Sequence, residues 1–326
     1  MGVVPGGRAG ARTAFCLDIG ADPLSRGAPC AVWRIEPVQP KEIEPGVTVY
    51  ETPVGTIQMK RRYSADGNTW FLVEHPLKTE EDYKVWMWIE EHTTHRVVLD
   101  GPKAAQAEYA DGLAIGMLVP RGKSAFQAMV ETLIGTEELA YALADFPDTV
   151  RALWQSMVRT NLEAVRLAMD SGYQYFLTWE DSSTQNYSPS MYDEFIGSEI
   201  GEWCRILDAH GKRYMQHACG HVRELVGRMK RHGAWGVESI SPEPTGNVSI
   251  REARRIVGPD FGIIGGIEPT EFLNRSEAEL VPYVEETIEA GGARYILANS
   301  DSCPVGVTVD KFRIVAETAR RFVPRR

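Results

Sequence analysis

The spacing of apolar positions divides the chain into a region that alternates residue by residue and a longer region of short apolar runs. In residues 47–76, apolar and polar residues alternate around glycine-containing turns, which predicts a hairpin or a short antiparallel excursion. Residues 78–95 predict an amphipathic helix with Thr79 as N-cap, because acidic residues follow in the first turn. The apolar pieces of residues 1–44 are short and cut by Gly and Pro, so we predict an irregular N-terminal segment there.

From residue 113 onward, apolar runs alternate with helical patterns. The predicted strands are 113–120, 173–181, 212–220, 234–243, 261–269 and 294–301. Between them, apolar residues recur at spacings of three and four, as in 147–172, which is typical of one face of a helix. Repeated strand–helix pairs predict parallel strands with crossover helices. The periodicity fits an open sheet as well as a closed (β/α)8 barrel, and a barrel would need two more strands before residue 113.

Composition narrows the class of protein mainly by exclusion. The chain has 326 residues, of which 43% are hydrophobic and 25% charged, as in a globular protein with a large core. The net charge of −10 argues against a nucleic-acid partner, since such binding depends on Lys and Arg neutralising phosphates. No apolar run is long enough to span a bilayer, so we expect no membrane partner. The five cysteines are too irregularly spaced for a disulfide framework, which favours a cytoplasmic location.

Side chains that can bind metal or move protons follow most of the predicted strands. They are Glu180 and Asp181, His217 and Cys219, Glu238 and Glu243, Glu268, and then Asn299, Asp301 and Cys303. In a barrel, the carboxyl ends of the strands share one rim, and active sites are built there. We therefore expect a shared functional rim, although loops after strands are often polar without any function.

His217 and Cys219 are the strongest metal candidates. Residues i and i+2 of an extended segment point to the same face, and imidazole with thiolate favours zinc over magnesium or calcium. Cys303, past a later strand end, is the predicted third ligand, and Glu180 or a water molecule the fourth. Three protein ligands and one exchangeable position are typical of catalytic zinc. The alternative is that Cys219 is a small buried apolar residue and His217 a hydrogen-bonded polar one.

Five motifs together resemble the uroporphyrinogen decarboxylase superfamily. They are "TWED" (178–181), "SPSMYDEFIGSEI" (188–200), "HACG" (217–220), "GIIGGIEPTEFL" (262–273) and "VDKFRIVAETARRF" (309–322). The resemblance covers roughly residues 45–324. It implies a (β/α)8 TIM barrel over residues 45–326, preceded by the irregular segment, with the first barrel strand missing or replaced by an unrelated start.

The superfamily includes haem-pathway decarboxylases and cobalamin-dependent methyltransferases. The decarboxylases carry an N-terminal Arg-Gln-Ala-Gly-Arg signature that we do not find here, so the resemblance favours the methyltransferase branch. That branch holds zinc with a His-x-Cys pair and a distant Cys, which implies His217, Cys219 and Cys303. It also implies a separate corrinoid protein as partner. The substrate would be a small thiol, alcohol or methyl ether that gives or receives the methyl group.

The other residues of the rim are expected to serve the same reaction. Their predicted roles are catalytic for Glu180 and Asp181, and substrate-binding for Glu238, Glu268 and Asn299. Two alternatives stay open. One is a metal-free decarboxylase or other carbon–carbon lyase, whose cationic cleft would come from Arg213, Arg223 and Arg251. The other is a non-catalytic barrel that binds a small ligand or a corrinoid partner.

Overall fold

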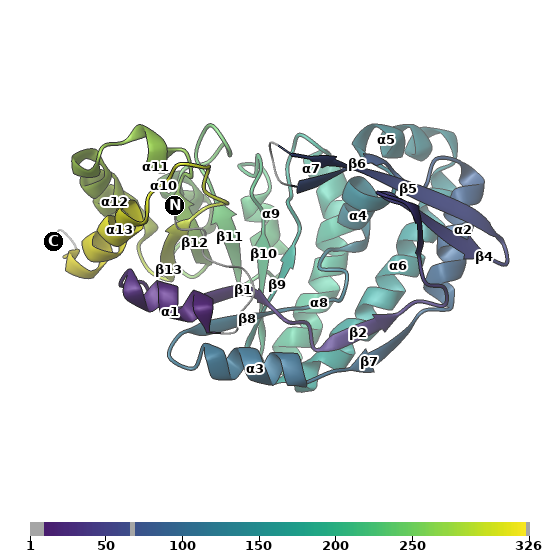
Figure 1. Cartoon of the computed structure of the whole chain (residues 1–326), viewed down its shortest axis with the longest axis horizontal. Coiled ribbons are helices and arrows are strands. Elements are labelled where there is room, and N and C mark those ends of the chain that lie inside the picture. The colour runs from purple at the N-terminus through teal and green to yellow at the C-terminus, as the bar shows by residue number, and fades with distance from the viewer. Residues whose placement is uncertain (1–9, 66–68, 324–326) are drawn as a thin grey trace.

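The computed structural model describes residues 10–65 and 69–323, and a sheet of seven parallel strands forms its centre (Figure 1). In spatial order the strands are β1 (Leu24–Ala28), β8 (Leu113–Met117), β9 (Tyr175–Trp179), β10 (Arg213–His217), β11 (Gly236–Ile240), β12 (Gly262–Ile267) and β13 (Tyr295–Asn299). All six strands predicted from residue 113 onward are confirmed, and each pairs in parallel with its neighbours.

The strand β1 lies in the N-terminal segment, so the prediction of irregular structure is wrong for residues 10–44. Its sequence, LSRGA, has little apolar character, and it forms a strand because β8 offers a partner, beginning with the pair Leu24 and Leu113. The same segment holds α1 (Ala11–Asp18), β2 (Val32–Ile35) and β3 (Lys41–Glu44). The sheet therefore includes residues before position 45, while residues 1–9 lie outside the described part.

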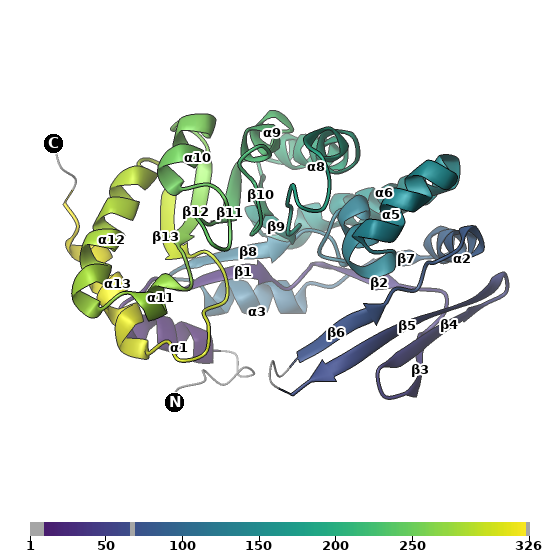
Figure 2. The ribbon, with the colours of Figure 1, turned by 90° about the horizontal axis from the view of Figure 1, so that it is seen from above.

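The seven strands form a barrel-like arc that is not closed (Figure 2). Within the described residues, β1 and β13 share no backbone pairing, so the predicted (β/α)8 barrel is confirmed only as a parallel, barrel-like α/β sheet. The chain between β1 and β8 forms antiparallel strands outside this sheet, so the described ranges contain no eighth parallel strand. A side chain joins the two edges instead, since Arg26 Nη1 of β1 donates to the Asn299 carbonyl oxygen at 3.3 Å.

Helices connect the parallel strands and pack against the sheet. The longer ones are α3 (Asp100–Glu108), α5 (Thr136–Asp145), α6 (Pro147–Leu167), α8 (Ser198–Ala209), α10 (Ile250–Val257), α12 (Glu277–Gly291) and α13 (Val309–Arg321). Shorter pieces are α4 (Ala125–Ala128), η1 (Met129–Leu133), η2 (Ala168–Ser171), α7 (Pro189–Met191), η3 (Tyr192–Gly197), α9 (Val226–Arg231) and α11 (Glu271–Asn274). The predicted apolar face of α6 is buried, with Leu153 and Met157 completely inaccessible. In the part of the chain that the structure describes, none of the helices combines the length and apolar character that crossing a membrane requires.

A second, antiparallel sheet contains the predicted hairpin. It consists of β3, β4 (Val47–Thr52), β5 (Gly55–Ser64) and β6 (Thr69–Glu74). The helix α2 (Glu80–Glu91) follows with the predicted Thr79 cap, and it ends earlier than expected because β7 (Thr94–Val97) pairs with β2. Figures 1 and 2 show this sheet, α2 and α5 at one end of the molecule, with α12 and α13 at the other.

Candidate metal centre

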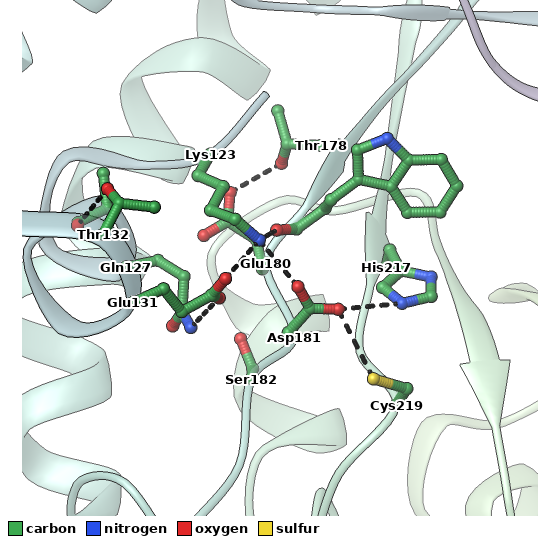
Figure 3. A network of polar contacts seen from close by, with 12 residues as sticks. Lys123, Gln127, Glu131, Thr132, Thr178, Glu180, Asp181, Ser182, His217 and Cys219 are labelled. Carbon is green, nitrogen blue, oxygen red and sulfur yellow. Dashed lines mark hydrogen bonds and ion pairs between the residues drawn. The ribbon is translucent and has the colours of Figure 1, made fainter. Parts of the chain in front are cut away.

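Three side chains meet at the carboxyl ends of β9 and β10. His217 ends β10, Cys219 lies two residues further on, and Asp181 follows the end of β9. One ligand atom from each lies within 4.8 Å of the others, and among the described residues these three form the one group of this kind with the composition of a metal site. We call Asp181, His217 and Cys219 the metal group (Figure 3).

The backbone at Asp181 has an uncommon conformation. Its φ of 43° lies in the left-handed region, which Asp tolerates better than most residues. Asp181 Oδ1 lies 3.1 Å from His217 Nε2 and accepts a hydrogen bond from Cys219 Sγ at 3.4 Å. Such conformations cluster at functional sites, where the surrounding contacts hold them in place.

The imidazole of His217 is held from both sides. Its Nδ1 is hydrogen-bonded to the fully buried carboxylate of Glu238 on β11, which in turn binds Arg26 of β1. The Trp179 ring stands edge-on to the imidazole, with ring centroids 4.7 Å apart. Trp179 can lie there because β1 has a glycine at position 27, where a Cβ would come within 2.7 Å of the indole. A carboxylate on the second ring nitrogen is the usual support of a metal-binding histidine.

The three members of the metal group shift one another's pKa values. Burial by itself would lower the pKa of His217, but hydrogen bonds to its carboxylate neighbours and to Cys219 raise it to about 11. Burial disfavours the charged form of Asp181, yet His217 and Lys123 hold the pKa of that carboxyl well below its usual range. Burial raises the pKa of the Cys219 thiol. A metal-free thiolate nucleophile is therefore disfavoured, whereas a bound divalent cation would ionise the sulfur.

Lys123 and Glu131 extend this network, and sequence reasoning missed both. Lys123 lies on the turn after β8, with its Nζ 2.6 Å from Asp181 Oδ2 and 2.7 Å from Glu131 Oε2. Figure 3 shows the ammonium group between the two carboxylates. Burial, with the nearby charge of Asp181, raises the pKa of Glu131 to about 6 against the influence of Lys123. Searching strand ends for cations as well as metal ligands would have found Lys123.

Glu180 was predicted to be catalytic, but its hydrogen bonds go elsewhere. Its fully buried carboxylate accepts from the Ser124 backbone N at 2.8 Å, from Ser124 Oγ at 2.6 Å and from Thr178 Oγ1 at 2.6 Å. Burial raises the pKa of Glu180. Asp181, whose backbone is left-handed, faces the metal group, while Glu180 ties the end of β9 to the chain after β8.

Cys303 was predicted as the third ligand, and the structure does not bring it into the metal group. It follows β13 and packs against an apolar cluster that includes Ile267 and Phe272. Burial raises the pKa of its thiol to about 11, with a further contribution from Glu268. Asp181, which arrives from β9, occupies the position in the group that the sequence assigned to Cys303.

The three residues predicted to bind substrate each make hydrogen bonds to different partners in the protein. Glu238 supports the imidazole of His217. Glu268 is fully buried and accepts hydrogen bonds from Thr245 Oγ1 at 3.1 Å and the Thr270 backbone N at 2.7 Å. Asn299 Nδ2 donates to the backbone oxygen of Asp301 at 2.7 Å. Substrate binding by these residues stays a prediction.

The arginines proposed for a decarboxylase cleft do not form one. Each is about half exposed and pairs with its own acidic neighbour: Arg213 with Asp208 at 2.9 Å, Arg223 with Glu252 at 3.0 Å and Arg251 with Glu286 at 3.7 Å. Arg26 and Lys123 reach the site instead, and both already bind carboxylates there. The metal-free alternative therefore loses the residues on which it depended.

Comparisons with known proteins bear on family and fold. The family model described as "Uroporphyrinogen decarboxylase (URO-D)" matches residues 72–322. No curated protein matches the sequence. The fold is similar to that of a methyltransferase from Methanosarcina mazei, with a TM-score of 0.55 at 12% identity over 83% of this chain and 74% of that one. A structure described as "Native KDPGal structure" gives a TM-score of only 0.29, at 12% identity over 67% of this chain and 74% of that one.

Proposed function

The chain belongs to the uroporphyrinogen decarboxylase (URO-D) family, and from this premise we propose that it is a zinc-dependent methyltransferase that works with a corrinoid protein. Its substrate would be a small thiol, alcohol or methyl ether. The observation that carries the proposal is the convergence of an imidazole nitrogen, a sulfur and a carboxylate oxygen at the strand ends. The likeness in fold to the Methanosarcina mazei methyltransferase supports the same branch.

The donor set fits zinc better than the hard cations. Nitrogen and sulfur ligands select zinc, and one carboxylate oxygen is compatible with it. His217 and Cys219 would hold the ion, with Asp181 as the third protein ligand. Cys303 stays the ligand predicted from the sequence, and it would take this role only if the segment after β13 carried its sulfur to the group.

The metal group is also accessible to a substrate. The Asp181 side chain is 36% exposed, and Cys219 is half-buried. The group lies at the carboxyl ends of the strands, where barrel enzymes bind their substrates. A corrinoid protein would have to approach the metal group from this exposed side.

Zinc bound here would lower the pKa of a substrate thiol or alcohol, or polarise a methyl ether. The chain supplies the surroundings for that chemistry. Lys123 Nζ bridges the carboxylates of Asp181 and Glu131, so Lys123 would give one of its protons to Glu131 and take up the proton that the substrate releases. Glu238 keeps the imidazole of His217 in place while substrates exchange.

Zinc content and methyl transfer test the proposal together. We expect purified protein to hold about one zinc per chain and to demethylate free methylcobalamin in the presence of a simple alkyl thiol, followed by absorbance. Chelation should remove both properties, and added zinc should restore them. Protein without zinc, or with turnover that survives chelation, would contradict the proposal. Zinc without turnover on a thiol, an alcohol or a methyl ether would favour the non-catalytic barrel.

A further inference from the structure

We propose a second binding site, for a small molecule that carries a carboxylate or phosphate oxyanion. It is a cavity of about 440 Å³ between the antiparallel sheet and the turn after β8. This volume is within the range of small-molecule sites. Its lining includes Arg34, Arg61, Arg121, Glu36 and Tyr50. The site does not rest on the proposed methyl transfer.

The lining carries a surplus of positive charge. Arg34 binds the buried Glu90 through two nitrogens, at 3.1 and 2.9 Å, and binds Glu36 at 3.0 Å. Arg121 reaches the same Glu90 at 2.5 Å. Three guanidinium groups thus face two carboxylates, which leaves one positive charge for a ligand to neutralise. Guanidinium groups bind carboxylate and phosphate through paired hydrogen bonds.

The deep wall of the cavity is buried, and one of its nitrogen atoms has no hydrogen-bond partner. The Arg34 and Arg121 side chains are only 10% and 14% exposed, and Glu90 is fully enclosed between them. One terminal nitrogen of Arg121, Nη1, is buried without a hydrogen-bond partner. A buried polar group without a partner requires an explanation, and an ion or water beside it is a common one.

The outer wall offers two groups that remain available. Arg61 on β5 is exposed, and within the described residues neither its guanidinium nor the Tyr50 hydroxyl makes a hydrogen bond or ion pair. Tyr50 is held in place by its edge-to-face contact with Trp86, with ring centroids 5.5 Å apart. A bound oxyanion could accept from both groups, while the body of the ligand would lie against Met59.

The cavity and the metal group are separate sites joined by one turn. Arg121 extends to Glu90 and the cavity, whereas Lys123, two residues later, extends to Asp181. Gly122 between them has a φ of 74°, and its carbonyl oxygen accepts from the Trp179 backbone N at 2.7 Å. The turn therefore presents its two cations to different clusters.

Titration calorimetry with inorganic phosphate and with succinate tests the site, with sodium chloride at the same ionic strength as the blank. Arg61→Gln changes an exposed cavity residue, and Arg62→Gln is the matched control, because neighbouring strand residues face opposite sides of the sheet. We expect Arg61→Gln to weaken binding by about 10- to 100-fold, with Arg62→Gln close to wild type. Both variants should keep the wild-type melting temperature.

The two ligands also separate the possible sources of the oxyanion. Binding of phosphate alone would identify a phosphorylated ligand, and binding of succinate alone a carboxylate. The inference is overturned if neither anion binds above the chloride blank. It is also overturned if Arg61→Gln and Arg62→Gln weaken binding equally, since that would reflect the general charge of the surface.

Discussion

Glu90 and Asp181 both contact cationic side chains, but Glu90 is fully enclosed by hydrogen-bond donors and Asp181 is not. Glu90 is enclosed by Arg34 and Arg121 and also accepts from Thr160 Oγ1 at 2.9 Å and Trp86 Nε1 at 2.8 Å. Burial by itself would raise the pKa of Glu90, but the two arginines lower it to about 2. Asp181 is 36% exposed and shares its contacts with Lys123 and His217, beside a thiol whose pKa is raised by burial.

Under the proposed function, this difference separates an acidic residue that stabilises the fold from one that would bind the zinc ion. At Glu90 every lone pair that the structure buries meets a donor, so its ion pairs are part of the core. At the metal group, a carboxylate, an imidazole and a thiol face one another, and the carboxylate is partly exposed. Changes at the two places should therefore affect different measurements.

The largest effect is expected for Glu90→Ala. Removing Glu90 leaves Arg121 without its carboxylate partner and Arg34 with Glu36 alone, and breaking a buried ion cluster in this way typically costs about 3–5 kcal/mol of unfolding free energy. Denaturant unfolding measures the loss. The exposed neighbour Glu91→Ala is the control and should stay within about 0.5 kcal/mol of wild type. If folded Glu90→Ala protein also loses zinc, the two regions are not independent.

Cys219→Ser should show the reverse pattern. Changing a residue that supports a metal ligand typically lowers metal affinity by roughly 10- to 100-fold. Cys219→Ser removes a proposed ligand itself, so its zinc affinity should fall by more than that, while the free energy of unfolding measured in chelator should stay at the wild-type value. Competition with a chromophoric chelator measures the zinc dissociation constants of the variant and of the wild type. Cys303→Ser is the matched comparison, and if Asp181 is the third ligand, as we propose, this change should alter zinc affinity by less than about twofold. A loss as large as that of Cys219→Ser would make Cys303 the third ligand.

Glu238→Gln should have an intermediate effect. The amide keeps the shape of the side chain but loses the charge that holds His217 Nδ1 and Arg26. Zinc affinity should fall by about 10- to 100-fold, as for other groups that orient a metal ligand. A loss as complete as that of Cys219→Ser would place Glu238 among the ligands. Unchanged affinity would show that His217 needs no support from this carboxylate.

The smallest effect is a dependence on pH at Glu90. Its pKa is lowered from 4.5 to about 2 in the folded chain, so the carboxylate contributes stability above 4.5 that is lost as pH falls towards 2. The stability gap between wild type and Glu90→Gln should therefore narrow from pH 5 to pH 3. Urea unfolding at several pH values measures this gap, with Glu91→Gln as control. A gap that widens towards acid would have the wrong sign.

Secondary structure was predictable wherever local pattern and tertiary pairing agreed. The strands β8 to β13 carry apolar runs, and α2 carries its capping signal, so each was found. The strand β1 was missed because its pairing with β8, rather than its composition, makes it extended. The pair His217 and Cys219 was predictable from a spacing of two residues, which fixes a shared face before any tertiary contact is known.

The sequence by itself determined the parallel α/β class and the nucleus of the metal group, because both follow from short-range periodicity along the backbone. Only the tertiary structure decided that Asp181, rather than Glu180, faces His217 and that Lys123 joins the group. It also decided that the sheet stays open. These outcomes depend on which strands become neighbours and on the direction of side chains from distant segments, and local spacing carries no information about either.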